Sequence, residues 1–321
     1  MRAVILEGNA VNPGDISWSP VTDLCETTVF PNTTEADKWD HLADADFVLS
    51  NKVVLDEAVF ARFPRIRYVG VCATGYNVID LEAARRHGVT VTNVPAYSTE
   101  SVVQHTFALL LEIASKVAPH AESVRRGDWT RSPTFCYWLS APMELSGRTF
   151  GVYGFGSIGR GVARVAQAFG MRVLACTLHP ERYKADYASP TLRFVDEETL
   201  LRESDVLSLH CPLTPATRGF IRAGNIARMK DGAILLNVAR GPVVEERDLA
   251  DALRSGKLAG AGLDVVAEEP MRADSPLLGA PNLVVTPHIA WASIEARTRL
   301  VDTIAANLRA YLDGAPQNVV S

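Results

Sequence analysis

Short apolar runs alternate with amphipathic segments along the first part of the chain. Residues 55–62 and 81–87 carry apolar side chains at helical spacing, and they lie between runs of strand-like composition. The predicted buried strands are residues 3–6, 27–30, 47–49, 67–71 and 90–94. Strands that alternate with helices in this way predict parallel pairing, with helices on both faces of a sheet.

A long helical pattern separates this series from a second one. It extends from about residue 100 to residue 117, and its apolar face carries Val103, Phe107, Leu110, Leu111 and Ala114. Further strands are predicted near residues 149–153, 172–176, 192–195, 205–210, 233–238, 260–265 and 283–286. The simplest organisation is an α/β protein of two doubly wound domains joined by the long helix.

Composition narrows the classes of function. With 321 residues, 47% hydrophobic and 21% charged, the chain is typical of a soluble globular protein of two domains. A formal charge of −5 gives no electrostatic reason to expect nucleic acid or an anionic membrane as partner. The five cysteines are odd in number and form no C-x-x-C pair, which predicts reduced thiols in the cytoplasm and no metal site. The start of the chain is too weakly apolar for a signal peptide, and no apolar stretch is long enough to span a membrane.

A glycine-rich turn opens the second series in "RTFGVYGFGSIGRGVARVAQAFG". Gly154, Gly156 and Gly159 form G-x-G-x-x-G directly after a predicted strand and before a predicted helix. The first glycine allows a tight turn, the second allows a pyrophosphate to approach the backbone, and the third allows helix and strand to pack closely. Since the helix N-terminus favours negative charge, this context predicts a dinucleotide-binding site.

The acidic residue that usually accompanies this motif is missing. A site that prefers NAD places Asp or Glu about 20 residues further on, where it holds the ribose 2′-hydroxyl. Here that position is Thr177, which cannot repel a 2′-phosphate. His179 and Arg182 follow and could bind such a phosphate, or they could be solvated loop residues. The sequence therefore predicts a nicotinamide cofactor, with NADP as a possible and even preferred form.

Polar residues follow three of the later strands. Arg240 follows "ILLNVA", Asp264 and Glu269 follow "GAGL", and His288 follows "NLVVTP". Ligands of such sheets bind outside the carboxyl ends of the strands, so these side chains are predicted to meet at one edge. Each has an ordinary alternative: Arg240 as a surface cation, Glu269 as an exposed carboxylate, and His288 as a cap.

Together these residues fit the reduction of a 2-keto acid. Arg240 can bind the substrate carboxylate and carbonyl oxygens through its planar guanidinium. His288 can protonate the carbonyl oxygen as hydride arrives, and Glu269 beside the imidazole would favour its protonated form. Asp264 could accept a hydrogen bond from the nicotinamide carboxamide.

Several motifs in order give the chain a resemblance to the NAD(P)-dependent D-2-hydroxyacid dehydrogenases. These motifs are "ATGYNVIDLEAARRHGVTVTNVPAYSTESVVQHTFALLL", "GFGSIG", "LHCPLTPAT", "LLNVARG", "GLDVVAEEP" and "TPHIAW". The resemblance implies a Rossmann cofactor domain, residues 99–287, inserted into a flavodoxin-like substrate domain, residues 1–98 and 288–321. It implies Arg240, Glu269 and His288 as catalytic residues, and Ala73, Thr74 and Gly75 beside the substrate carboxylate together with Arg240 and His288. It also places further residues against the cofactor: Ser157, Ile158, Cys211, Pro212, Thr217, Val238, Ala239 and Asp264.

The motifs "SPTFCYW" and "TPHIAWAS" are most similar to the glycerate dehydrogenase/hydroxypyruvate reductase branch of this family. Reduction of hydroxypyruvate or glyoxylate is therefore expected. Dehydrogenation of another small acid such as phosphite or lactate stays open, as does a dinucleotide-sensing corepressor-like role. The apolar long helix and the aromatic segment "WTRSPTFCYW" predict a homodimer.

Overall fold

The computed structural model describes residues 1–321, and the chain divides into two compact units. Unit 1 comprises Met1–Ser98 and Trp291–Ser321, and unit 2 comprises Thr99–Ala290. The sequence-based division placed the second crossing before His288. In the structure His288 and the two residues after it lie in unit 2, because their backbone N–H groups donate to Asp264 in that unit.

Unit 1 contains a five-stranded parallel sheet with strand order β2-β1-β3-β4-β5. Its strands are β1 (Arg2–Ile5), β2 (Glu26–Val29), β3 (Phe47–Ser50), β4 (Tyr68–Val71) and β5 (Thr90–Thr92). Its helices are α1 (Gly8–Val11), α2 (Ser19–Thr22), α3 (Lys38–His41), α4 (Glu57–Arg62), α5 (Leu81–Arg86) and α13 (Ile294–Leu312). This strand order is that of the flavodoxin-like fold, as predicted.

Unit 2 contains a seven-stranded parallel sheet with strand order β12-β11-β10-β9-β6-β7-β8. Its strands are β6 (Thr149–Tyr153), β7 (Arg172–Cys176), β8 (Leu192–Phe194), β9 (Val206–Leu209), β10 (Ala233–Asn237), β11 (Leu258–Leu263) and β12 (Leu283–Val285). The order reverses between β6 and β9, which is the Rossmann arrangement with one added strand, and a dinucleotide binds at such a switch point.

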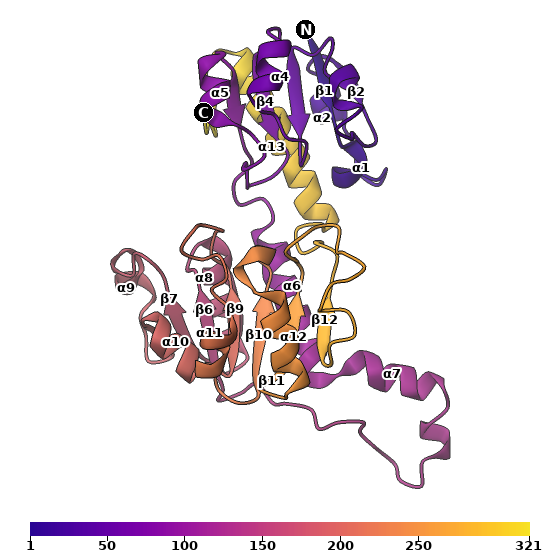
Figure 1. Cartoon of the computed structure of the whole chain (residues 1–321), viewed down its shortest axis with the longest axis vertical. Coiled ribbons are helices and arrows are strands. Elements are labelled where there is room, and N and C mark those ends of the chain that lie inside the picture. The colour runs from indigo at the N-terminus through magenta and orange to yellow at the C-terminus, as the bar shows by residue number, and fades with distance from the viewer. The chain divides into compact units, whose positions relative to one another are not determined.

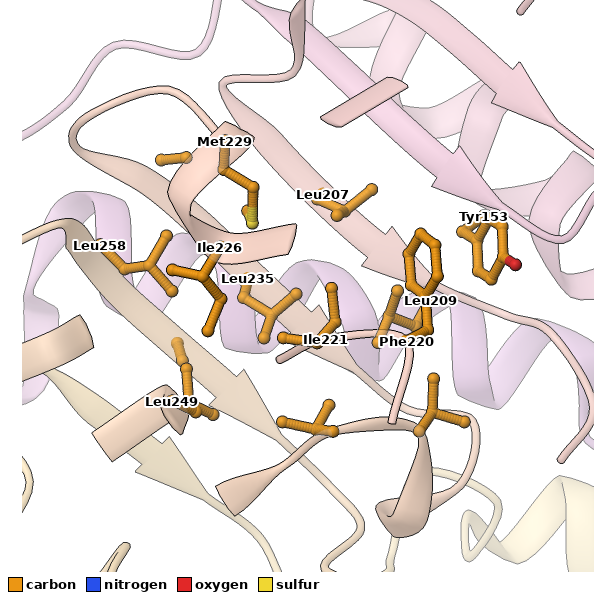
Figure 2. Close-up of a cluster of buried hydrophobic side chains, with 14 of the residues drawn as sticks. Tyr153, Leu207, Leu209, Phe220, Ile221, Ile226, Met229, Leu235, Leu249 and Leu258 are labelled. Atoms are coloured by element: carbon orange, nitrogen blue, oxygen red, sulfur yellow. The ribbon is translucent and has the colours of Figure 1, made fainter. Parts of the chain in front are cut away.

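Helices cover both faces of the unit 2 sheet (Figure 1). The helices of this unit are α6 (Thr99–Ser115), α7 (Val117–Arg125), α8 (Ser157–Ala168), α9 (Glu181–Tyr187), α10 (Glu197–Glu203), α11 (Ala223–Arg228) and α12 (Glu246–Arg254), with short 3-10 turns η1 (Trp129–Arg131) and η2 (Gly241–Val243). One core packs α6 and α8 against the sheet. The other packs α10, α11 and α12 against the opposite face, and Figure 2 shows its centre around Leu207, Leu235 and Ile226. These buried faces explain why the strands read as continuous apolar runs.

The predicted long helix, about residues 100–117, is helix α6 in the structure, and a second helix, α7, follows it. Helix α6 ends at Ser115, and Lys116 adopts a left-handed backbone with φ of 51° before α7 begins. Because a residue with this φ cannot continue a helix, the chain changes direction at Lys116. Helix α7 and the segment after it extend away from the unit 2 sheet (Figure 1).

The aromatic segment that follows α7 is exposed. Trp129 is 52% exposed, Phe135 89% and Trp138 66%. No helix of the chain is long and apolar enough to cross a bilayer.

Candidate active site

The glycine-rich turn connects β6 to α8 at the switch point of the unit 2 sheet. Gly154 has φ of 99°, and a Cβ atom built on Gly159 would lie 2.1 Å from the Gly154 carbonyl oxygen. Both positions therefore require glycine. A Cβ on Gly156 would meet no atom within 4 Å, and Gly156 and Ser157 are exposed. The N-terminus of α8 thus presents an unobstructed row of N–H groups, which fits a dinucleotide pyrophosphate.

Two further loops follow strands at the same edge of the sheet. After β9, Cys211 is buried, and the Thr217 hydroxyl donates to the Pro212 carbonyl at 2.7 Å. After β10, Val238 and Ala239 are both buried, and the Ala239 N–H donates to the Asn237 side chain at 3.0 Å. These predicted cofactor residues therefore lie in loops that their own hydrogen bonds hold in shape.

The segment after β7 carries the residues predicted to select the cofactor. Thr177 is half-buried directly after the strand, and Leu178 beyond it is 91% exposed. His179 lies 3.3 Å from the Glu181 carboxylate. Arg182 is exposed, and it lies in the first turn of α9 rather than in a loop as the sequence indicated. No acidic side chain occupies the end of β7, so the sequence reading of Thr177 is unchanged.

His288 and Glu269 are in direct contact. The His288 Nδ1 atom lies 2.7 Å from Glu269 Oε2, and the side chains are 28% and 32% exposed. The other Glu269 oxygen accepts the Val266 N–H at 3.3 Å. A carboxylate that accepts from Nδ1 fixes the orientation of the imidazole ring, so proton exchange with a substrate is directed to Nε2.

Arg240 lies in the turn between β10 and η2. Arg240 is exposed, and its Nη1 donates to the Ala239 carbonyl at 2.7 Å. The backbone carbonyl of Arg240 accepts a hydrogen bond from the Asn237 side chain at 3.0 Å. A Cβ on Gly241 would lie 1.8 Å from the Val266 carbonyl oxygen. The turn that carries Arg240 is therefore pressed against the segment that leads to Glu269.

Asp264 is a buried carboxylate, 1% exposed, at the end of β11. Its Oδ1 accepts the Thr286 hydroxyl at 2.6 Å and the Ile289 N–H at 2.9 Å, and its Oδ2 accepts the Ala290 N–H at 2.8 Å. Burial alone would raise the pKa of this carboxyl, but the hydrogen bonds outweigh it and hold the pKa below its ordinary value. Asp264 therefore shapes the turn that carries His288. The sequence analysis predicted only a contact between Asp264 and the cofactor.

In unit 1 the predicted substrate loop follows β4. The Val94 N–H donates to the Ala73 carbonyl at 3.0 Å, and the Thr74 hydroxyl donates to the Val94 carbonyl at 2.8 Å. The backbone N–H groups of Thr74 and Gly75 donate no hydrogen bond within the protein. Such N–H groups suit a carboxylate ligand.

Two residues at these sheet edges escaped the sequence analysis. Glu7 follows β1, and its Oε2 accepts the N–H groups of Asn51 at 2.8 Å and Lys52 at 2.9 Å. His210 follows β9, where burial lowers the pKa of its imidazole to about 3 and its Nδ1 has no partner. The signal that found Arg240 and His288, a polar residue within three positions of the end of a strand, applies to both.

Comparisons with known proteins identify the family of the chain. Residues 107–290 match the family model described as D-isomer specific 2-hydroxyacid dehydrogenase, NAD binding domain. The chain is 46% identical to a hydroxypyruvate reductase of Blautia hydrogenotrophica over the whole of both chains. It is 41% identical to a glycerate dehydrogenase of Methylorubrum extorquens, over 88% of this chain and 87% of that one.

Solved structures with a similar fold include members of the same class of dehydrogenase. A protein from Thermus thermophilus superimposes over the whole of both chains with a TM-score of 0.85 and 34% identity. A D-lactate dehydrogenase from Aquifex aeolicus, complexed with NAD and lactic acid, superimposes with a TM-score of 0.81 and 27% identity, over 98% of this chain and 96% of that one.

The chain belongs to the family of D-isomer-specific 2-hydroxyacid dehydrogenases. It is an oxidoreductase that interconverts 2-hydroxy acids and 2-keto acids with a nicotinamide cofactor. Its NAD-binding domain lies within unit 2.

Proposed function

We propose that the protein reduces hydroxypyruvate or glyoxylate to the corresponding hydroxy acid, as a reductase of the glycerate dehydrogenase type. The full-length relative named hydroxypyruvate reductase and the one named glycerate dehydrogenase support this choice of substrate. The observation that carries the proposal is the 2.7 Å contact between His288 Nδ1 and Glu269 Oε2 at the carboxyl edge of the unit 2 sheet. A histidine oriented in this way is suited to proton transfer at a substrate oxygen.

Each polar residue of the site has a distinct task in this proposal. A bound reduced nicotinamide supplies the hydride. Arg240, whose guanidinium forms no ion pair, binds the carboxylate and keto oxygens of the substrate. His288 gives a proton from Nε2 to the keto oxygen and takes it back in the oxidative direction, while Glu269 holds the imidazole ring through Nδ1. Ala73, Thr74 and Gly75 offer backbone N–H groups to the substrate carboxylate.

The decisive experiment is a substrate panel with purified protein. Hydroxypyruvate, glyoxylate and pyruvate are each assayed with NADH and NADPH, and phosphite is assayed with NAD⁺ and NADP⁺, by the change in absorbance of the cofactor. We expect the highest kcat/KM for hydroxypyruvate or glyoxylate. A clear preference for pyruvate or phosphite would assign another substrate, and cofactor binding without turnover of any acid would favour a binding protein.

We also propose that NADPH is used at least as well as NADH. Thr177 cannot repel a 2′-phosphate, and Arg182 is an exposed cation without an acidic partner in the first turn of α9. One charge-assisted hydrogen bond of about 1.5–3 kcal/mol would favour NADPH by about one to two powers of ten. His179 contributes less because Glu181 lies beside it.

Three variants test this preference. Arg182→Ala should raise KM for NADPH and leave KM for NADH nearly unchanged. Lys184→Ala is the matched control, because Lys184 is an exposed cation of the same helix. Thr177→Asp should shift the enzyme toward NADH by restoring the ribose contact and the repulsion of the 2′-phosphate. Strong NADH selectivity that survives in Arg182→Ala would show that this helix does not select the cofactor.

We further propose that the protein is a homodimer that assembles through α7 and the segment after it. Large exposed aromatic side chains concentrate there, including Trp129, Phe135 and Trp138. Two-fold dimers are the commonest oligomers, and exposed apolar patches mark interfaces. Light scattering at micromolar concentration should give twice the chain mass, and Phe135→Ser with Trp138→Ser should give a monomer. A monomeric wild-type protein contradicts this assembly.

We also propose that the protein is cytoplasmic. All five cysteines are free thiols, which is the state that a reducing compartment maintains. Fractionation of the source cells, with detection by a specific antibody, would test this placement.

A further inference from the structure

His288 has an unfavourable backbone conformation. Its φ is 56°, in the left-handed region that side chains with a Cβ rarely adopt. Its N–H donates to the carbonyl oxygens of Asp264 and Thr286, each at 2.9 Å. A conformation of this kind persists only where the surrounding structure holds it. The residues that hold the turn Thr286–Ala290, here called the His288 turn, therefore set the position of the imidazole.

The hydrogen bonds around Asp264 have a fixed direction. An ionised carboxylate only accepts, so the Thr286 hydroxyl must donate its proton to Asp264 Oδ1, 2.6 Å away. Thr286 Oγ1 also lies 2.9 Å from His105 Nε2. Since the only proton of that hydroxyl is already donated, His105 Nε2 must carry a proton and donate it to Thr286. The same Nε2 lies 3.4 Å from Asp264 Oδ1.

We propose that His105 is a positioning residue for the reaction: its Nε2–H orients Thr286 and Asp264, and these two hold the His288 turn in its left-handed conformation. The inference rests on the proposed role of His288 in proton transfer. His105 itself touches neither Glu269 nor His288 in the hydrogen-bond network.

Electrostatics supports this role for His105. Asp264 is buried, and burial opposes its ionised form. The nearby His105 Nε2, 3.4 Å from Asp264 Oδ1, lowers the pKa of this carboxyl more than Thr286, Ala290 or Ile289 does. An ionised Asp264 can accept from the turn on both oxygens, so removing His105 weakens the acceptor on which the turn depends.

The position of His105 in the fold makes the support rigid. It lies within α6, between Thr106, which is fully buried, and the exposed Gln104. Val103, Phe107 and Leu110 of the same helix are part of the core beneath the sheet. His105 therefore lies on a packed helix and not on the loops after β11 and β12, so it can act as a fixed support for these loops.

The test compares His105→Leu with His105→Gln. A Gln amide nitrogen can occupy the place of Nε2 and donate to Thr286, whereas Leu cannot. We expect His105→Leu to lower kcat at least tenfold with little change in the Kd of the nicotinamide cofactor, and His105→Gln to recover most of the loss. Gln104→Ala on the same helix should behave as wild type. In the double variant with Thr286→Val, the two losses in kcat should be less than multiplicative, because both remove one chain of hydrogen bonds.

Hydrogen exchange separates this inference from the proposed function. The Ile289 and Ala290 amides should exchange at least tenfold faster in His105→Leu than in wild type, a result that needs no substrate. Wild-type kcat and unchanged exchange at these amides in a folded His105→Leu would overturn the role of His105 and leave the proposed reaction intact. If wild-type protein reduces no 2-keto acid, the proposed function fails, and the exchange rates still decide whether His105 holds the turn.

Discussion

In both units a carboxylate at the edge of the sheet accepts hydrogen bonds from a neighbouring loop, but the two carboxylates lie in different environments. In unit 1, Glu7 follows β1 and accepts the N–H groups of Asn51, Lys52 and Val53, which follow the neighbouring strand β3. In unit 2, Asp264 follows β11 and accepts the N–H groups of the turn after the neighbouring strand β12. In each case a carboxylate at one strand end shapes the loop at the next.

The two carboxylates differ in burial and in the backbone that they hold. Asp264 is 1% exposed and has His105 in support, whereas Glu7 is half-buried and receives only N–H groups and the Ser50 hydroxyl. The loop after β3 contains no residue of positive φ, whereas the turn after β12 contains His288. Water can replace part of what Glu7 does, but it cannot reach Asp264. Burial of the carboxylate therefore accompanies strain in the residue that it positions.

The largest effect is expected at His288, where the side chain and the backbone can be separated. Asparagine tolerates left-handed φ better than other residues with a Cβ, so His288→Asn should keep the turn and remove only the imidazole. We expect kcat to fall by about 10²–10⁴-fold, the usual contribution of a general acid. His288→Ala should lose as much activity and in addition unfold at a lower temperature. Near wild-type turnover in His288→Asn would exclude proton transfer by this residue.

A smaller loss is expected when Asp264 loses its charge. In Asp264→Asn one oxygen must serve N–H groups that two oxygens served before, and hydrogen bonds to a charged group are worth about 1.5–3 kcal/mol each. We therefore predict a fall in kcat of about 10²-fold, measured at saturating substrate and cofactor. A change confined to the KM of the cofactor would mean that Asp264 acts on the ligand alone and not on the His288 turn.

Glu7→Gln should have a milder effect of another kind. The amide keeps an acceptor oxygen, and the site is open to water, so we expect less than a tenfold change. Because Asn51 donates to the Cys72 carbonyl at 2.8 Å, loosening its loop disturbs the proposed substrate loop after β4. The change should therefore appear in KM for the 2-keto acid, with kcat preserved. Glu26→Gln, at an exposed carboxylate of the same unit, is the control, and a fall in kcat as large as that of Asp264→Asn would remove the contrast between the two units.

The smallest effect is expected in the acid stability of unit 2. The pKa of Asp264 is lower in the folded protein than its ordinary value of 3.8, so the ionised form contributes stability above that pH. This contribution is lost as pH falls through the folded pKa. The difference in unfolding free energy between wild type and Asp264→Asn, measured in urea, should therefore be largest near pH 7 and shrink below about pH 4. A difference independent of pH would show that the carboxyl is not ionised.

The sequence predicted every strand of both sheets, because parallel strands covered on both faces consist of consecutive apolar residues. It also predicted that Arg240, Glu269 and His288 follow strands of one sheet, although which atoms meet depends on side-chain geometry. The long helix was predicted to within two residues of its end at Ser115, but helix α7 after Lys116 was not predicted. His105 was missed because it lies inside a helix, away from any strand end. Its relevance depends on the distance to Thr286, a residue far along the chain.

The close packing at Gly241 limits the mutations that its codon can tolerate. A Cβ at this position would lie 1.8 Å from the backbone of Val266, so the turn after Arg240 admits no side chain at all. Every single-base change of a glycine codon that alters the amino acid and does not stop translation introduces a residue with a Cβ. Every missense mutation at this codon therefore disturbs the packing of the turn. Relatives that keep this turn should therefore keep glycine at this position.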